Sequence, residues 1–225
     1  MGSMNDRTIG RAGFLGILGL GAAGLFLAKD VTGLLDRAVP KSVSSIVPTS
    51  GWRIYTIGDS MPTFDPATYR LNVSGLVGSP TSFTLADLKA MPRADQVSDF
   101  HCVTGWSVSD VRWGGVRIAD LLEAAGARKS VRALNFVSTE VPYEDSLTLK
   151  QALLPDVMLA YEMDGAPIKR PHGAPVRLVM PQMYGYKSVK WVDRIELGTV
   201  AEPGYWEQNG YDADAWIGKS NGFSS

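Results

Sequence analysis

After residue 63, proline and glycine repeatedly interrupt the apolar residues of this chain, so each apolar run is short. Three of these runs have helical spacing, and each ends at a helix-stopping residue: Leu85–Met91 before Pro92, Ile118–Ala125 before Gly126, and Leu149–Leu154 before Pro155. A crossover between two parallel strands needs about a dozen residues or more. Helices this short therefore exclude a fold built from regular βαβ units.

The other apolar runs alternate with polar residues or are rich in β-branched residues, which is typical of strands. We expect strands at Tyr69–Val73, Gln96–Val103, Ala133–Ser138, Met158–Met163, Val176–Met180 and Ser188–Leu197. The dipeptide Asp164-Gly165 suits positive φ and predicts a hairpin that returns through Ala166–Lys169. The sequence thus predicts an α+β fold, a single mixed domain that is strand-rich with short helices.

The N-terminal part differs in character from the rest. An uncharged, glycine-containing apolar run at 12–28 follows Arg7 and Arg11, which is the layout of an export signal. A helix formed by this run would be roughly 25 Å long, slightly less than the thickness of the hydrocarbon core of a membrane, which is roughly 30 Å. We therefore expect a signal-like or membrane-anchor segment at 1–39, a Ser-, Pro- and Gly-punctuated tether at 40–63 and a domain at 64–225. The protein is then exported or membrane-attached, on the periplasmic or extracytoplasmic face rather than in the cytoplasm.

Composition limits the partners and the metal sites. Twenty-two Lys and Arg residues balance 23 Asp and Glu residues, so the formal net charge is −1. We expect no nucleic-acid partner, because such binding needs clustered positive charge. The single cysteine, Cys102, excludes an internal disulfide and any zinc site with two or more cysteines, and two histidines exclude a three-histidine metal centre.

Cys102 lies in the segment 99–107, at the predicted end of a strand and next to Thr104-Gly105. A lone cysteine in a strand is usually a small buried apolar residue. A strand end followed by a loop, however, is where a rigid scaffold often carries functional groups. A cysteine hydrolase is a third interpretation, with His172 as the base, since the adjacent His101 side chain points to the opposite face of a strand. The residues alone leave all three open.

A second segment, 171–191, concentrates donors near prolines and glycines that fix tight turns. Its basic side chains are His172, Arg177, Lys187 and Lys190. Cationic donors beside exposed backbone N–H groups suit a phosphate or another dense anion. The interleaved aromatic residues favour an anion site here over the alternative of a solvated, charged strand.

The two segments together resemble the sulfite oxidase family. His172-Gly-x-Pro-Val-Arg177, followed by Tyr184-Gly-Tyr-Lys-Ser-Val-Lys-Trp191, is similar to the molybdopterin-binding segment of that family. Phe100-His-Cys-Val-x-x-Trp-Ser107 resembles its metal-binding cysteine motif, in the form found in bacterial methionine sulfoxide reductase catalytic subunits. The resemblance covers about residues 54–220 in consistent order.

This resemblance implies a molybdenum–molybdopterin cofactor. It makes Cys102 the thiolate ligand of molybdenum, a suitable role for a soft ligand, and Tyr211 a catalytic tyrosine beside the metal. The cofactor-binding residues that it implies are Tyr55, Cys102, Ser138, Thr139, His172, Arg177, Ser188, Val189 and Lys190.

The implied function is a molybdopterin-dependent oxidoreductase that catalyses oxygen-atom transfer on a small-molecule oxo-substrate, as sulfoxide reduction or sulfite-type oxidation. Animal relatives carry arginines just after the metal-binding cysteine, where this chain has Gly105, Trp106 and Ser107. Part of a sulfite site is then missing unless Arg112 or Arg117 replaces it. Trp106 predicts either an apolar pocket rim that favours a neutral sulfoxide or a plain core aromatic.

The resemblance also implies a separate redox partner, a membrane cytochrome b-type subunit or a small c-type cytochrome, because nothing in the motifs carries electrons further. The alternative is a catalytically silent subunit with the same fold, which serves as a cofactor- or anion-binding scaffold.

Overall fold

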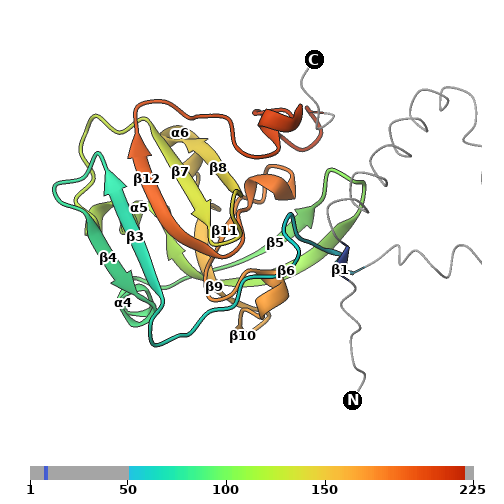
Figure 1. Ribbon diagram of the computed structural model, residues 1–225, viewed down its shortest axis with the longest axis horizontal. Helices are drawn as coiled ribbons and strands as arrows, with labels where there is room; N and C mark the ends of the chain where they lie inside the picture. The colour runs from blue at the N-terminus through green and yellow to red at the C-terminus, as the bar shows by residue number, and fades with distance from the viewer. Residues whose placement is uncertain (1–7, 10–50, 221–225) are drawn as a thin grey trace, which may run out of the picture.

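Strands dominate the part of the chain that the structure describes, residues 8–9 and 51–220 of a computed structural model (Figure 1). One sheet has the order β4-β3-β12-β7-β8, formed by Thr81–Thr84, Arg70–Gly75, Val192–Gly198, Ala133–Ser138 and Glu144–Thr148. The other has the order β10-β9-β6-β5, formed by Ala166–Pro167, Met158–Met163, Ser107–Arg117 and Ala94–His101. In addition, β11 (Arg177–Val179) pairs with β9, and β2 (Ile54–Tyr55) pairs in parallel with β1 (Thr8–Ile9).

The first sheet is mixed, because β12 pairs in parallel with β3 and antiparallel with β7. Three short α-helices follow strands: α4 (Leu85–Ala90), α5 (Ile118–Ala124) and α6 (Leu149–Ala152). Single 3₁₀ turns form η1 (Arg170–His172), η2 (Gly185–Lys187) and η3 (Glu207–Asn209). The predicted strand-rich, mixed α+β domain is confirmed.

Local chemistry explains where the helices start. Thr84 caps α4: its Oγ1 accepts from Asp87 N at 3.0 Å, and Asp87 Oδ2 accepts from Thr84 N at 2.8 Å. Thr148 and Gln151 form the same reciprocal pair at the start of α6. Such capping boxes satisfy backbone N–H groups that have no partner inside the helix, so these starts are encoded within four residues.

The hairpin β9–β10 has the predicted turn, with Asp164 at φ 52° and Gly165 at φ 77°. The long strand β6 escaped the sequence analysis, because Gly114-Gly115 lies inside it. A Cβ on Gly115 would lie 2.0 Å from the Leu159 carbonyl oxygen of β9, so only glycine permits this approach. The register shifts between the two glycines, which indicates a β-bulge.

A large apolar core includes residues of both sheets, and a smaller cluster forms around Trp113 and Met158. Trp52 packs against the smaller cluster and Tyr55 against the larger one. Residues 51–63 fall in the range expected as a tether, and there Ile54 and Thr56 are buried. The segment 52–57 thus runs between the two apolar clusters.

Apart from Thr8–Ile9, the segment expected as a signal or anchor lies outside the described residues, as does 40–50 of the expected tether. Within residues 8–9 and 51–220, no helix has the length and apolar character that a membrane span requires.

Candidate active site

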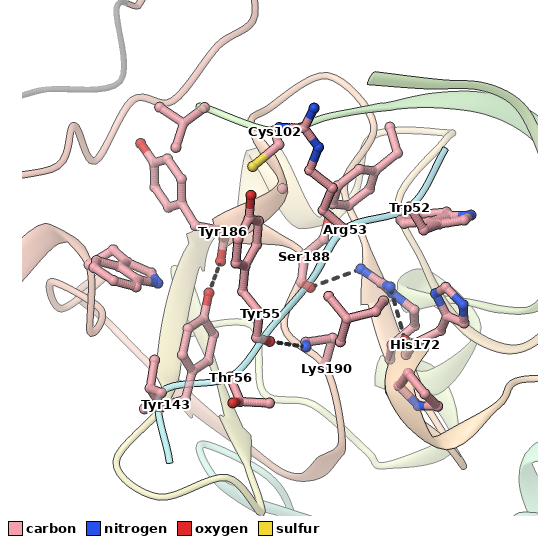
Figure 2. A pocket seen from close by; sticks show the side chains of 18 of the residues that line it. Trp52, Arg53, Tyr55, Thr56, Cys102, Tyr143, His172, Tyr186, Ser188 and Lys190 are labelled. Carbon is pink, nitrogen blue, oxygen red and sulfur yellow. Dashed lines mark hydrogen bonds between the residues drawn. The ribbon is translucent and has the colours of Figure 1, made fainter. Parts of the chain in front are cut away.

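A cavity of about 900 Å³, including the part open to solvent, lies where the ends of several elements meet (Figure 2). Most residues that the sequence predicts as site residues line it together: Tyr55, Cys102, His172, Arg177, Ser188, Lys190 and Tyr211. They come from segments that are far apart in the chain. The contributing segments are β2, the loop after β5, η1, β11 and the segments after η2 and η3. The fold therefore gathers the two motif segments around one space.

Ser138, Thr139 and Val189 do not line this cavity. Ser138 is buried at the end of β7, where its Oγ accepts from Glu140 N at 3.0 Å. Thr139 N donates to Trp191 O at 2.9 Å, and Val189 is fully buried in the core. These three residues support the cavity wall from behind.

A tight turn after β5 presents the thiol of Cys102. Cys102 N donates to Trp106 O at 2.9 Å and Gly105 N donates to Cys102 O at 3.0 Å. Gly105 has φ +88°, a left-handed conformation that favours glycine. The Sγ atom lies 3.1 Å from Thr104 Oγ1. The turn therefore fixes the direction of the thiol.

Burial raises the pKa of the Cys102 thiol. Smaller effects lower this pKa, and they come from the hydroxyl and backbone of Thr104, the charge of Arg53 and the indole of Trp106. Cys102 is a free cysteine and is only partly exposed. The thiol is therefore protonated by itself, and a bound metal ion would be needed to hold it as a thiolate.

Arg177 is a buried cation that is held by carbonyl groups. It donates to His172 O at 2.9 Å and to Ser188 O at 3.2 Å. Its guanidinium also lies 5.5 Å from the ring centroid of Phe100 and 5.2 Å from that of Trp113. Burial lowers its pKa to about 10.

Lys190 is a second cation in the same wall. Its Nζ donates to Tyr55 O at 2.6 Å and lies 4.0 Å from the ring centroid of Trp191. Burial lowers its pKa to about 7, against the attraction of Glu140, and Arg177 lowers it further. Within the described residues, neither Lys190 nor Arg177 forms an ion pair with a carboxylate.

The donor set fits the group that the sequence implies. Three basic residues, Arg53, Arg177 and Lys190, line the cavity against one carboxylate, Glu140. Cationic donors gathered in this way suit an anion such as a phosphate ester. Cys102 adds one soft ligand of the kind that suits a thiophilic metal. The residues present thus fit a molybdenum–molybdopterin cofactor.

The sequence analysis predicted Tyr55 but missed its neighbours in the segment 52–57, namely Trp52, Arg53, Ile54, Thr56 and Ile57, which also line the cavity. Glu140 Oε1 accepts from Ile57 N at 2.9 Å and so joins this segment to the β7–β8 loop. The Trp52 ring lies 5.0 Å from that of His172, edge to face, and Arg53 points toward Cys102 (Figure 2). The cluster Trp52-Arg53-Ile54-Tyr55 within a Ser- and Pro-rich stretch was the signal that could have revealed it.

Tyr211 follows η3 and Gly210, which has φ +91°. Its ring packs against Tyr186 at 5.3 Å and against Trp206 at 5.1 Å between centroids. Burial, with a smaller effect of Cys102, raises its pKa above the ordinary tyrosine value. The phenol is therefore neutral and can donate a proton in a hydrogen bond.

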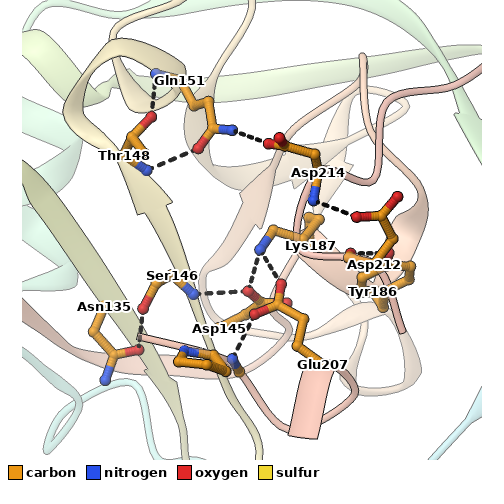
Figure 3. A network of polar contacts seen from close by, with 12 residues as sticks. Asn135, Asp145, Ser146, Thr148, Gln151, Tyr186, Lys187, Glu207, Asp212 and Asp214 are labelled. Atoms are coloured by element: carbon orange, nitrogen blue, oxygen red, sulfur yellow. Dashed lines mark hydrogen bonds and ion pairs between the residues drawn. The ribbon is translucent and has the colours of Figure 1, made fainter. Parts of the chain in front are cut away.

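Lys187 does not serve the cavity (Figure 3). Its side chain is 2% exposed, and its ammonium pairs with Asp145 Oδ1 at 2.5 Å and with Glu207 Oε1. Gly204 N donates to the other oxygen of Glu207 at 2.7 Å. Burial raises the pKa of Asp145 to about 7. This network joins η2, β8 and η3, and so fixes the segment that carries Tyr211.

Neither arginine expected as a substitute for the sulfite site lines the cavity. Arg112 lies on β6 with an exposed side chain, and Arg117 donates to Gln96 Oε1 at 2.5 Å. Among the described residues that line the cavity, Arg53 is the cation whose charge acts on Cys102.

Residues 58–206 match the family model of the oxidoreductase molybdopterin binding domain. The chain is 36% identical over 170 residues to the uncharacterized oxidoreductase YuiH of Bacillus subtilis, over 75% of this chain and 85% of that protein. It is 33% identical over 187 residues to a putative protein-methionine-sulfoxide reductase subunit, YedZ1, of Azospira oryzae, over 80% of this chain and 70% of that protein.

A sulfite oxidase of Arabidopsis thaliana is 32% identical over 178 residues, 64% of this chain and 45% of that protein, so the chain spans less than half of that relative. The crystal structure of the sulfane dehydrogenase SoxCD from Paracoccus pantotrophus matches with a TM-score of 0.60 and 26% identity, over 64% of this chain and 42% of that one. The chain belongs to the oxidoreductase molybdopterin-binding domain family of the sulfite oxidase type, and it is an oxidoreductase whose cofactor is molybdenum–molybdopterin.

Proposed function

We propose that this protein catalyses oxygen-atom transfer on a small neutral oxo-substrate, as reduction of a sulfoxide, with Cys102 as the protein ligand of molybdenum. The observation that carries the proposal is that one cavity is lined by the Cys102 thiol and by Arg177 and Lys190, which form no ion pair with a carboxylate within the described residues. A thiolate-bound metal and an anchored phosphate need this combination.

The cations form the anchoring end of the site. Arg177 and Lys190 attract the anionic pterin phosphate, and His172 with Ser188 lines the same wall. Gly173 permits this packing, because a Cβ there would lie 2.9 Å from Lys190 Cβ, and its φ is +105°. The fixed carbonyl contacts of Arg177 hold the guanidinium in place before the cofactor binds.

When bound, the molybdenum–pterin group supplies the two-electron oxygen-atom transfer. Reduction of a sulfoxide to a sulfide consumes two electrons and two protons and releases water. Tyr211 donates a hydrogen bond to the substrate oxygen as a neutral phenol, and Arg53 stabilises negative charge near Cys102. Trp52 and Trp106 line the cavity with apolar surface and keep water away from the reacting atoms.

The apolar rim supports a sulfoxide over sulfite. Sulfite is a dianion and needs several cations around its oxygens. Arg112 and Arg117 lie outside the cavity, and Arg177 and Lys190 are assigned to the pterin phosphate, which leaves Arg53 near Cys102. The similarity to a protein named as a putative protein-methionine-sulfoxide reductase subunit points in the same direction.

We also propose that the electrons come from a separate cytochrome-type protein, either a membrane cytochrome b-type subunit or a small c-type cytochrome. The relative from Azospira oryzae is named as a subunit, which supports a partner. The export-like pattern at 1–39 supports a location outside the cytoplasm, exported or attached to a membrane.

The test uses protein produced in a host that makes the molybdenum cofactor. Molybdenum and pterin are measured per chain, and turnover is measured with methionine sulfoxide and with sulfite for the wild type and for Cys102→Ser. We expect Cys102→Ser to retain pterin but to lose sulfoxide reduction, whereas Lys190→Met loses pterin.

Sulfite oxidation without sulfoxide reduction would reverse the proposed direction. Unchanged turnover in Cys102→Ser would refute the role of the thiolate. If the protein is a silent scaffold subunit, Cys102→Ser would change no property that depends on the metal.

A further inference from the structure

The indole of Trp106 carries a hydrogen-bond donor that the mechanism above does not use. Trp106 is 5% exposed and lines the cavity of Cys102. Its Nε1 is buried and has no hydrogen-bond partner within residues 8–9 and 51–220. A buried N–H without a partner costs about 1–3 kcal/mol, so such a group calls for an explanation.

Two sets of contacts hold this indole beside the thiol. Its backbone carbonyl accepts from Cys102 N at 2.9 Å, which closes the turn between the two residues. Its ring packs against three aromatic rings, at centroid distances of 5.7 Å to Phe100, 6.2 Å to Trp52 and 6.2 Å to Tyr55. The ring is therefore fixed by its surroundings and cannot turn away from the cavity.

The thiol is a poor acceptor as long as it is protonated, and it already contacts Thr104 Oγ1. A sulfur held as a thiolate by a metal carries negative charge and accepts hydrogen bonds much better.

We propose that Trp106 Nε1–H donates a hydrogen bond to the sulfur of Cys102 when that sulfur is bound to molybdenum, and thereby raises the reduction potential of the metal. This inference rests on the proposal that Cys102 is the metal ligand. A donor to a ligating sulfur withdraws electron density and stabilises the reduced, more electron-rich centre. Trp106 is then a positioning and tuning residue, next to the metal but not bound to it.

Trp113 offers a matched control within the same chain. Its Nε1 is also buried without a hydrogen-bond partner among the described residues, but Trp113 does not line this cavity. Trp106→Phe and Trp113→Phe therefore remove the same N–H group and retain an aromatic ring, one beside the thiol and one away from it.

The experiment is a redox titration of the loaded proteins, in which electron paramagnetic resonance detects the paramagnetic, one-electron reduced metal. We expect Trp106→Phe to have a more negative midpoint potential. A change of tenfold in the reduction equilibrium, the upper end for a single hydrogen bond, corresponds to 59 mV for a one-electron couple. Trp113→Phe should have the potential of the wild type.

A second measurement does not depend on the folding of any variant. Wild-type protein labelled with ¹⁵N in the indole ring should show a hyperfine coupling from an indole nitrogen to the metal signal. A missing coupling, or equal potentials for loaded Trp106→Phe and wild type, overturns the inference. If loaded Cys102→Ser has the same metal signal as the wild type, Cys102 is not the metal ligand and the proposed function fails instead. Failure of the tuning role and failure of the proposed ligand are therefore distinguishable.

Discussion

Replacement of Lys187 by Met tests how the segment that carries Tyr211 is fixed. The change removes one cation from between two buried carboxylates, whose side chains are 2% exposed for Asp145 and 5% exposed for Glu207. Two charge-assisted hydrogen bonds are lost, at about 1.5–3 kcal/mol each. Removal of one partner from a buried ion pair costs about 3–5 kcal/mol, and we expect this loss in the free energy of unfolding.

For a domain of this size, about 1 kcal/mol shifts the melting temperature by roughly 2–4 °C. We therefore expect Lys187→Met to melt roughly 6–20 °C below the wild type, measured by circular dichroism at pH 8 with equal cofactor content. Lys150→Met is the control, because Lys150 is exposed on α6 and forms no ion pair within the described residues. Its free energy of unfolding should stay within about 0.5 kcal/mol of the wild type.

The penalty should depend on pH. Asp145 has a pKa raised to about 7 in the fold, against an ordinary value of 3.8. Its protonated form therefore contributes stability that is fully present below about pH 4 and is lost as the pH rises through about 7. Without the Lys187 cation, the ionised carboxylates repel each other, so the loss in Lys187→Met should be larger at pH 8 than at pH 5. A loss below about 1 kcal/mol at pH 8, or the same loss at both pH values, would refute this reasoning.

Two further substitutions test the packing beside the site and in the core. In Gly185→Ala, the added Cβ would lie 2.2 Å from the ring of Phe100, so we expect a loss of about 1–3 kcal/mol in urea unfolding and reduced pterin content. Gly58→Ala is the control, because no heavy atom lies closer than 3.8 Å to the added Cβ, and its free energy of unfolding should stay near that of the wild type. Equal losses of stability in both variants would contradict the clash at Gly185. Tyr69→Phe removes the donor to Val192 O at 2.7 Å and should cost about 1–2 kcal/mol, while a loss under about 0.3 kcal/mol would mean that the carbonyl finds another donor.

Local sequence was sufficient wherever a few neighbouring residues set the structure. The capping box of Thr84 and Asp87, the turn at Asp164-Gly165 and the helix that begins at Ile118 all depend on residues within a few positions of each other. The strand β6 was missed for the opposite reason: the pattern Gly114-Gly115 is typical of a strand break, and the approach of Leu159 on β9 that requires Gly115 is a long-range contact.

The motif residues of the site were identified from the sequence, since Cys102, His172, Arg177 and Lys190 lie in two recognisable segments. Their burial in a common cavity is a property of the fold. Lys190 donates to Tyr55, 135 residues away, and Ile57 donates to Glu140 at a separation of 83 residues.

The amino-acid pattern was therefore enough to predict the three short helices, the Asp164-Gly165 hairpin, the family and the candidate residues of the site. The three-dimensional fold was needed to show that the neighbours of Tyr55 in 52–57 line the cavity with it. It was also needed to show that Lys187 neutralises two buried carboxylates and does not bind an anion in the cavity. It also excluded Arg112 and Arg117 from the site. The physical reason is that burial and charge pairing depend on which distant segments meet, and the pattern of one segment contains no information on its partner.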